Sequence, residues 1–228
     1  MVIIFDLDDT LYDERTYVES GFRAVASFGA ARFGWNKAAS IRFMLDTLEH
    51  EGRGAVFDRW LENSGRYSNS LVQECIRVYR NHQPRLHLYR EARTLLPTLS
   101  RYPLYIVTDG HKVVQQKKVE GLRIERRFRH IFITHRYGVR HEKPSTYCFE
   151  RIRLRERCEW EDMIYIGDNP AKDFVNLNSL GVATVRVLTG GYRAVKAAKS
   201  ADARFTIPHL GHFGDLLAKE LGTWMNAR

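Results

Sequence analysis

Residues 2–10 read Val-Ile-Ile-Phe-Asp-Leu-Asp-Asp-Thr, an apolar run that ends in carboxylates. A short apolar run of this kind predicts a buried strand. Side chains two residues apart on a strand share one face, and burying Asp6 and Asp8 on one face would be costly. We therefore expect the strand to end at Asp6, so that both carboxylates lie at its tip. In open parallel sheets this edge is where ligands bind.

Length and composition describe an ordinary globular protein. The 228 residues are enough for one large domain or for a domain with an inserted module. No apolar run approaches the length of a membrane span, and the first residues lack the pattern of a signal peptide. The three cysteines are odd in number and lack the spacing of a metal site. We therefore expect a cytoplasmic protein without a membrane partner.

The chain is basic, with a net charge of +9. The densest basic stretch, residues 123–140, contains Arg123, Arg126, Arg127, Arg129, Arg136 and Arg140. Such a stretch can contact nucleic acid through phosphates, or it can be a solvated surface that concentrates anionic small substrates. No nucleic-acid motif accompanies it. The second interpretation is favoured, and nucleic acid is not an expected partner.

Residues 14–83 have the pattern of helices. Apolar residues recur there at helical intervals, glycines separate the segments, and Pro84 closes the region. This pattern predicts four helices and no strand. The predicted domains are therefore a helical module at residues 14–85, inserted after the first strand, and a core formed by residues 1–13 and 86–228.

From residue 91 onward, strands and helices alternate. The predicted strands are residues 104–107, 131–133, 163–166, 182–185 and 204–207. The predicted helices are residues 93–100, 111–120 (ended by Gly121), 144–154, 170–179 and 213–221. Alternation of this kind predicts an α/β fold with a Rossmann-like, doubly wound and mainly parallel sheet.

Polar residues follow the apolar strands. The first strand is followed by Asp6 and Asp8, and the others by Thr108-Asp109-Gly110, Lys143-Pro144 and Gly167-Asp168-Asn169-Pro170. Because parallel strands end at one edge of the sheet, we expect these residues to form one site.

The residue types at this edge suit phosphoryl transfer. Asp6 can attack phosphorus as a carboxylate nucleophile and form an aspartyl-phosphate. Asp8 can protonate the leaving oxygen and later deprotonate the hydrolytic water. The oxygen ligands of Asp6, Asp8 and Asp168 suit Mg²⁺.

The remaining residues of this edge suit an anion. The Thr108 hydroxyl and the Gly110 N–H precede a helix N-terminus, which favours phosphate. Lys143 supplies positive charge that can hold a phosphoryl group against several carboxylates.

Each member also has a plain structural interpretation. Asp109 can cap a helix, Asn169 and Pro170 form a suitable cap and first-turn pair, and Lys143 can be a surface residue. Four matched strand ends in one chain make coincidence a poor explanation.

The four segments together resemble the four motifs of the haloacid dehalogenase-like hydrolase superfamily, and the helical insertion resembles its C1 cap. The motif residues are Asp6-Leu7-Asp8-Asp9-Thr10, Thr108-Asp109-Gly110, Lys143-Pro144 and Gly167-Asp168-Asn169-Pro170-Ala171-Lys172-Asp173. The resemblance implies a Mg²⁺-dependent hydrolase, usually a phosphatase.

The resemblance also implies residue roles. Asp6 would be the nucleophile and Asp8 the general acid and base. The metal would be bound by the Asp6 side chain, the Asp8 backbone carbonyl and Asp168, while Asp173 and Asn169 would support it from the second shell. Thr108, Asp109, Gly110 and Lys143 would bind the phosphoryl group.

One position departs from the family pattern. Asp109 stands where the family more often has Asn, and a carboxylate cannot donate a hydrogen bond as an amide does. The role of that Asn in substrate contact therefore does not carry over to Asp109, while Thr108 and Gly110 around it are intact and the site is expected to survive.

The expected function is hydrolysis of a small phosphorylated metabolite, such as a sugar phosphate, a nucleotide or an organic phosphate. True dehalogenases of the family lack the second aspartate, so Asp8 favours phosphoester chemistry. Two alternatives stay open: a phosphomutase on the same core, and a non-catalytic binding or regulatory protein that uses its basic surface. The sequence is compatible with a monomer or a homodimer.

Overall fold

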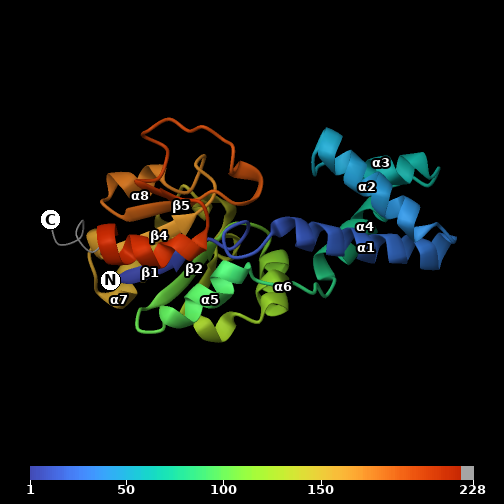
Figure 1. Cartoon of the computed structure of the whole chain (residues 1–228). Coiled ribbons are helices and arrows are strands. Elements are labelled where there is room, and N and C mark those ends of the chain that lie inside the picture. Colours follow the sequence, from blue (N-terminus) through green and yellow to red (C-terminus); the bar gives the residue numbers. More distant parts are fainter. Residues whose placement is uncertain (222–228) are drawn as a thin grey trace. The chain divides into compact units, whose positions relative to one another are not determined.

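The computed structural model describes residues 1–221. The chain divides into two compact units, one formed by Met1–Glu14 with the chain from His87 onward, and one formed by Arg15–Leu86 (Figure 1). Residues 222–228, which belong to the range expected for the core, lie outside the described residues.

A six-stranded sheet forms the centre of the first unit. Its strands are β1 (Val2–Phe5), β2 (Leu104–Thr108), β3 (His130–Ile133), β4 (Met163–Gly167), β5 (Ala183–Val187) and β6 (Phe205–Ile207). They lie in the order β3-β2-β1-β4-β5-β6, and every neighbouring pair is parallel. The predicted α/β, doubly wound parallel sheet is therefore confirmed. Its strand order reverses beside β1, the position where sheets of this class bind ligands.

Helices cover the sheet on two faces. They are α5 (Arg90–Thr98), α6 (Lys112–Leu122), α7 (Tyr147–Glu156), α8 (Val175–Ser179) and α9 (Phe213–Leu216). On one face, Ile4 and Tyr165 belong to a core cluster with Phe149 of α7 and Leu177 of α8. On the other face, the ring of Phe5 lies edge-on to those of Phe128 and Phe213. Alternate residues of β1 thus bury apolar area on opposite sides, which explains why the whole strand is apolar.

The second unit consists of four helices, as the periodicity predicts. They are α1 (Glu14–Phe33, whose first residue belongs to the other unit), α2 (Lys37–Glu51), α3 (Val56–Asn63) and α4 (Asn69–Asn81). Asn36 and Ser68 cap α2 and α4 by accepting hydrogen bonds from backbone N–H groups. The helices share an apolar core that includes Phe22, Met44 and Trp60.

Several helix boundaries differ from prediction: the helices expected at residues 93–100, 144–154 and 213–221 are α5 (Arg90–Thr98), α7 (Tyr147–Glu156) and α9 (Phe213–Leu216). Two further differences show how side chains and backbone conformation set a boundary. The helix expected at residues 170–179 begins only at Val175, because side chains of the preceding loop bind its backbone, as described below. The helix expected to end before Gly121 continues to Leu122 and ends with Arg123 in the left-handed conformation, at φ 55°. Within residues 1–221, no helix combines the length and the apolar character that a membrane span requires.

Candidate active site

The polar residues expected at the strand ends do lie at one edge of the sheet. Asp6 follows β1, Asp109 follows β2 and Asp168 follows β4, while Lys143 lies in the connection between β3 and α7. Asp6, Lys143 and Asp168 are all buried. Residues from four separate parts of the sequence therefore converge, as the parallel topology requires.

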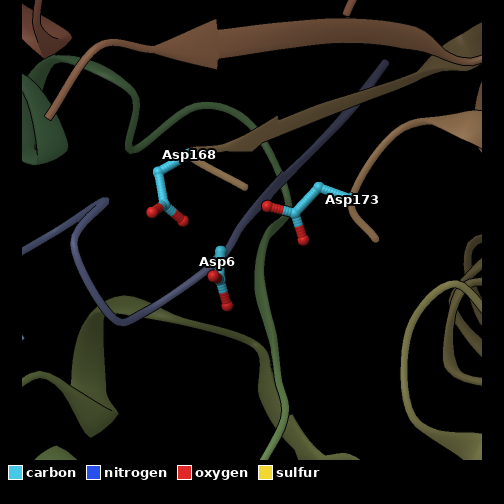
Figure 2. A group of neighbouring side chains, drawn as sticks. All are labelled: Asp6, Asp168 and Asp173. Atoms are coloured by element: carbon cyan, nitrogen blue, oxygen red, sulfur yellow. The ribbon is translucent and has the colours of Figure 1, made fainter. Parts of the chain in front are cut away.

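Three carboxylates at this edge form a compact acidic cluster. Asp6, Asp168 and Asp173 each offer an oxygen within 4.8 Å of the others (Figure 2). Burial raises the pKa of Asp6 to about 7, against the opposing effect of the Lys143 charge. Burial and then the charge of Asp6 raise the pKa of Asp168 to about 9. Buried carboxylates this close together are costly unless a cation joins them.

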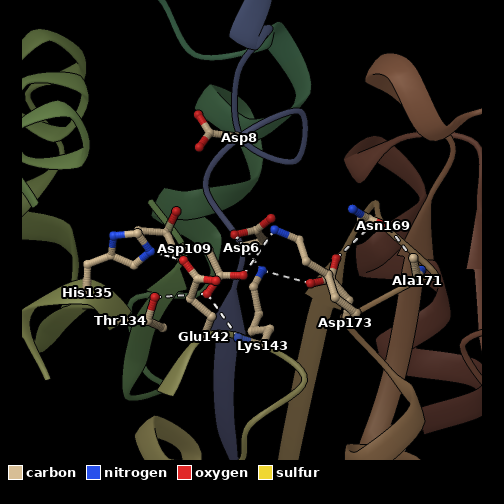
Figure 3. Close-up of polar contacts among 12 residues, drawn as sticks. Asp6, Asp8, Asp109, Thr134, His135, Glu142, Lys143, Asn169, Ala171 and Asp173 are labelled. Carbon is tan, nitrogen blue, oxygen red and sulfur yellow. Dashed lines mark hydrogen bonds and ion pairs between the residues drawn. The ribbon is translucent and has the colours of Figure 1, made fainter. Parts of the chain in front are cut away.

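Lys143 supplies one such cation. Its Nζ lies 2.9 Å from Asp6 Oδ1 and 2.7 Å from Asp173 Oδ1 (Figure 3). It also lies 2.9 Å from the Tyr165 hydroxyl oxygen. Burial lowers the pKa of Lys143, but the charges of Asp173 and Asp6 outweigh it and hold that pKa well above its usual value. The ammonium therefore stays charged inside the protein.

Tyr165 is a site residue that the sequence reasoning missed. It lies in β4 among apolar residues, but its hydroxyl accepts from Lys143 and donates to Asp173 Oδ1 at 3.1 Å. The available signal was chemical: a tyrosine in a fully buried strand needs a partner for its hydroxyl.

The loop after β4 folds around its own side chains. Asp173 Oδ2 accepts the Asn169 N–H at 2.9 Å, and Asn169 Oδ1 accepts the Ala171 N–H at 3.0 Å. These bonds hold residues 169–173 in a turn and delay the helix to Val175. Gly167 packs against the Asp173 carboxyl so closely that a Cβ atom there would collide with it. The turn thus presents Asp168 and Asp173 to the same point.

Asp8 has different partners from Asp6. Its Oδ1 accepts from the Tyr12 hydroxyl at 2.6 Å and from Lys118 Nζ at 2.8 Å, and its Oδ2 accepts from Gln115 Nε2 at 2.8 Å. Its carboxylate lies apart from the acidic cluster around Asp6 (Figure 3).

Gln115 and Lys118 of α6 are two further residues at the site that the sequence did not predict. They are three residues apart and hence share one face of the helix, which was the only local signal. Lys118 also pairs with Glu14 at 2.9 Å. Burial lowers the pKa of Lys118, but the charges of Asp8 and Glu14 raise it overall.

Thr108 and Gly110 flank Asp109 at the start of α6. The Thr108 hydroxyl oxygen accepts from Gln115 Nε2 at 2.7 Å, which leaves its O–H able to donate. Gly110 has a φ of 126°, a conformation that favours glycine. These features suit the predicted oxyanion role of the two residues.

Asp109 is fully engaged as an acceptor. Its Oδ1 accepts from the Thr134 hydroxyl at 2.9 Å and from the Lys143 backbone N–H at 3.1 Å (Figure 3). Its Oδ2 pairs with Lys172 Nζ at 3.0 Å. Burial raises the pKa of Asp109, but the charges of Lys143 and Lys172 lower it overall, so this carboxyl is ionised. Lys172 belongs to the fourth motif, but the family resemblance gives it no role, and no spacing rule connects it with Asp109.

Members of the basic stretch have local partners. Arg129 pairs with Glu156 at 2.8 Å, and Arg136 donates to Gln116 at 2.7 Å.

The match to a known family covers most of the chain. A family model described as haloacid dehalogenase-like hydrolase matches residues 3–187. The chain is 28% identical over 224 residues to a glyceraldehyde 3-phosphate phosphatase of Methanocaldococcus jannaschii, covering 94% of this chain and 96% of the relative. A protein of the same name from Pyrococcus furiosus is 26% identical over 232 residues, covering 97% and 95%.

Solved structures share the fold at lower identity. The putative HAD-hydrolase YfnB from Bacillus subtilis, solved bound to magnesium, is 19% identical with a TM-score of 0.69, covering 95% of this chain and 97% of that one. A HAD phosphatase from Thermococcus onnurineus is 20% identical with a TM-score of 0.61, covering 96% and 98%.

Proposed function

The chain belongs to the haloacid dehalogenase-like hydrolase family, as its four motifs predicted, and we propose that it is a Mg²⁺-dependent phosphatase of small phosphorylated metabolites. One observation carries the proposal: Asp6, the buried candidate for the nucleophile, lies beside two further carboxylates and the ammonium of Lys143.

The acidic cluster fits a hard divalent cation. Asp6, Asp168 and Asp173 offer only oxygen ligands, which Mg²⁺ prefers. The pKa values of Asp6 and Asp168 are raised although Lys143 is close, so the cluster needs more positive charge than Lys143 alone provides. Asp6 and Asp168 would hold the ion with the backbone carbonyl of Asp8, and Asp173 and Asn169 would support it. A bound Mg²⁺ would neutralise charge on the phosphoryl oxygens and keep both carboxyls ionised.

Asp6 would start the reaction. One oxygen of its carboxylate attacks phosphorus, the bond from phosphorus to the ester oxygen breaks, and an aspartyl-phosphate forms. Lys143 fixes the attacking carboxylate through Asp6 Oδ1. Thr108 and the Gly110 N–H would bind phosphoryl oxygens at the neighbouring strand end.

Asp8 would manage the protons. Its carboxyl gives a proton to the leaving alcohol oxygen and then takes one from the water that attacks phosphorus, which releases inorganic phosphate and restores Asp6. For this, its side chain must turn away from Lys118 and Gln115, which now hold it.

We propose a short sugar phosphate, of the glyceraldehyde 3-phosphate class, as the substrate. The support is that relatives named glyceraldehyde 3-phosphate phosphatase align with nearly the whole chain. The helical unit of residues 15–86 is proposed to act as the cap that selects the substrate.

The test is phosphate release with and without Mg²⁺ or chelator. The substrates are glyceraldehyde 3-phosphate, longer sugar phosphates, nucleoside monophosphates and an aryl phosphate, each with wild type and Asp6→Asn. The proposal expects metal-dependent turnover that Asp6→Asn abolishes. Isomerised sugar phosphate without released phosphate would instead establish a mutase. No turnover by folded, Mg²⁺-loaded protein would favour the binding protein.

A further inference from the structure

The Lys143 ammonium has no N–H group left for a substrate. An ammonium carries three donors, and Lys143 Nζ makes three contacts, to Asp6, Asp173 and Tyr165. Its side chain is 1% exposed. In this arrangement Lys143 organises the carboxylates and contributes charge, but a cationic donor to the phosphoryl group, beside Thr108 and Gly110, has to come from another residue.

Asp109 increases that need. The carboxylate follows Thr108 directly at the end of β2, and its pKa is lowered, so it presents a negative charge where a phosphate dianion is expected. An unpaired carboxylate at this point would repel the substrate.

Lys172 offers a positive charge and free N–H donors, which neither Lys143 nor Asp109 can supply to a phosphoryl group. Its Nζ donates to Asp109 Oδ2 at 3.0 Å, which uses one of its three donors. Its side chain is 34% exposed, against 1% for Lys143, so solvent reaches it. Asp109 Oδ1 also accepts the backbone N–H of Lys143, so Asp109 and Lys172 lie beside the residue that holds Asp6.

We propose that Lys172, held in place by Asp109, is the direct cationic ligand of the substrate phosphoryl group. Asp109 and Lys172 together replace a neutral amide donor: the carboxylate positions the lysine, and the lysine's two other N–H groups bind phosphoryl oxygens. The role rests on the proposed phosphatase function, but it can be measured through anion binding alone.

The first test measures affinity for inorganic phosphate by calorimetry in the presence of Mg²⁺, for wild type, Lys172→Met and Lys196→Met. Loss of a charge-assisted hydrogen bond predicts an affinity about tenfold weaker in Lys172→Met. Lys196 is exposed in the loop after β5 and serves as the matched control for net charge. Its variant should bind phosphate as wild type does. The melting temperature and Mg²⁺ affinity, each without phosphate, verify that Lys172→Met folds and binds metal.

The second test uses the pair. Asp109→Asn in the Lys172→Met background removes the uncompensated carboxylate and restores an amide donor, so phosphate affinity should recover several-fold. A purely structural ion pair predicts a lower melting temperature for Lys172→Met with unchanged phosphate affinity, and that result would overturn the proposal. Equal affinities of the single and double variants would also overturn it.

The same variants separate this role from the proposed function. If wild type hydrolyses sugar phosphates but Lys172→Met keeps its kcat/KM and phosphate affinity, the lysine role is wrong and the phosphatase stands. If wild type hydrolyses nothing but Lys172→Met weakens phosphate binding, the lysine role stands and the phosphatase function fails.

Discussion

The two units of the chain place their charges in opposite ways. The sheet unit buries charged side chains, among them Asp6, Lys118, Lys143, Asp168, Asp173 and Arg186. In the helical unit, the buried polar residues within the described chain are only Ser40 and Thr47. Its ion pairs lie on the surface and join Arg15 to Glu19 and Glu49, Arg23 to Glu19, Arg32 to Glu74, and Arg59 to Glu51 and Glu62.

This difference separates stability from function. Exposed ion pairs contribute little, because water and salt screen them, so the helical unit depends on its apolar core. Buried charges hold only as a complete set, since removing one leaves another uncompensated. The acidic cluster therefore weakens the metal-free fold while preparing a site.

The largest difference is expected between removing a buried cation from the sheet unit and removing an exposed cation from the helical unit. Lys143→Met should lower the free energy of unfolding by about 3–5 kcal/mol, because Asp6 and Asp173 lose their buried partner. Arg59→Met also removes a cation with two carboxylate partners, but on the surface, and should leave the free energy of unfolding nearly unchanged. Urea denaturation in metal-free buffer measures both, and equal losses would contradict the comparison.

The pH dependence of stability should reveal the buried carboxyls. The pKa of Asp6, about 7, and that of Asp168, about 9, both exceed the ordinary value of 3.8, so the folded state binds more protons than the unfolded state between these values. Their contribution is present below pH 4 and is lost as the pH rises through 7 and 9.

Metal-free protein should therefore lose several kcal/mol of stability between pH 5 and pH 8, because both carboxyls contribute. Saturating Mg²⁺ should remove most of this loss. Chemical denaturation at both pH values, with chelator or with Mg²⁺, tests it. A metal-free stability that rises over this range would refute the assignment.

Tyr165→Phe tests the bridge between Lys143 and Asp173. Loss of the hydroxyl should cost about 1–2 kcal/mol and lower kcat more than it raises KM, because the lysine moves relative to Asp6. Tyr67→Phe is the matched control in the helical unit, where an exposed hydroxyl donates to Asn69 at 3.0 Å. Denaturation should give Tyr67→Phe the same free energy of unfolding as wild type, and steady-state kinetics should give it the same kcat and KM.

Apart from the control variants, Ser68→Ala should give the smallest loss of stability. The Ser68 hydroxyl accepts the Leu71 N–H at 3.3 Å and caps α4, and its loss should cost about 0.5–1 kcal/mol. The helical unit has no buried charge network to amplify the change. A loss above about 2 kcal/mol in thermal denaturation would mean that this unit is as sensitive as the sheet unit.

Patterns along the sequence predicted the architecture well. The four helices and the strand ends follow from periodicity and from where apolar runs stop, and both are local properties. They placed Asp6, Thr108, Lys143 and Asp168 at one edge because a parallel sheet brings strand ends together.

The partnerships inside the site were not predictable in the same way. Tyr165 reads as an apolar strand residue, and its role depends on Lys143 and Asp173, which come from two other segments. The pair of Asp109 and Lys172 likewise joins two loops that no spacing relates.

The predicted ends of two helices were wrong for a related reason. Asn169 and Asp173 bind the backbone of their own turn in preference to starting a helix. Arg123, without glycine's freedom, nevertheless adopts the left-handed conformation that ends α6. In both places side-chain contacts and tertiary packing override local propensity.

The central position of β1 has a consequence for how the protein is made. β1 is synthesised before both of its neighbours: Ile3 pairs with Leu104 and Val2 pairs with Met163, so the strand stays without partners until β2 and β4 have left the ribosome. Pairings this distant in sequence close slowly and leave apolar strands exposed meanwhile. The residues of the helical unit contact mostly their own neighbours and are complete much earlier. The nascent chain therefore carries its future nucleophile at the end of an unpaired, aggregation-prone strand, and chaperone demand should centre on β1.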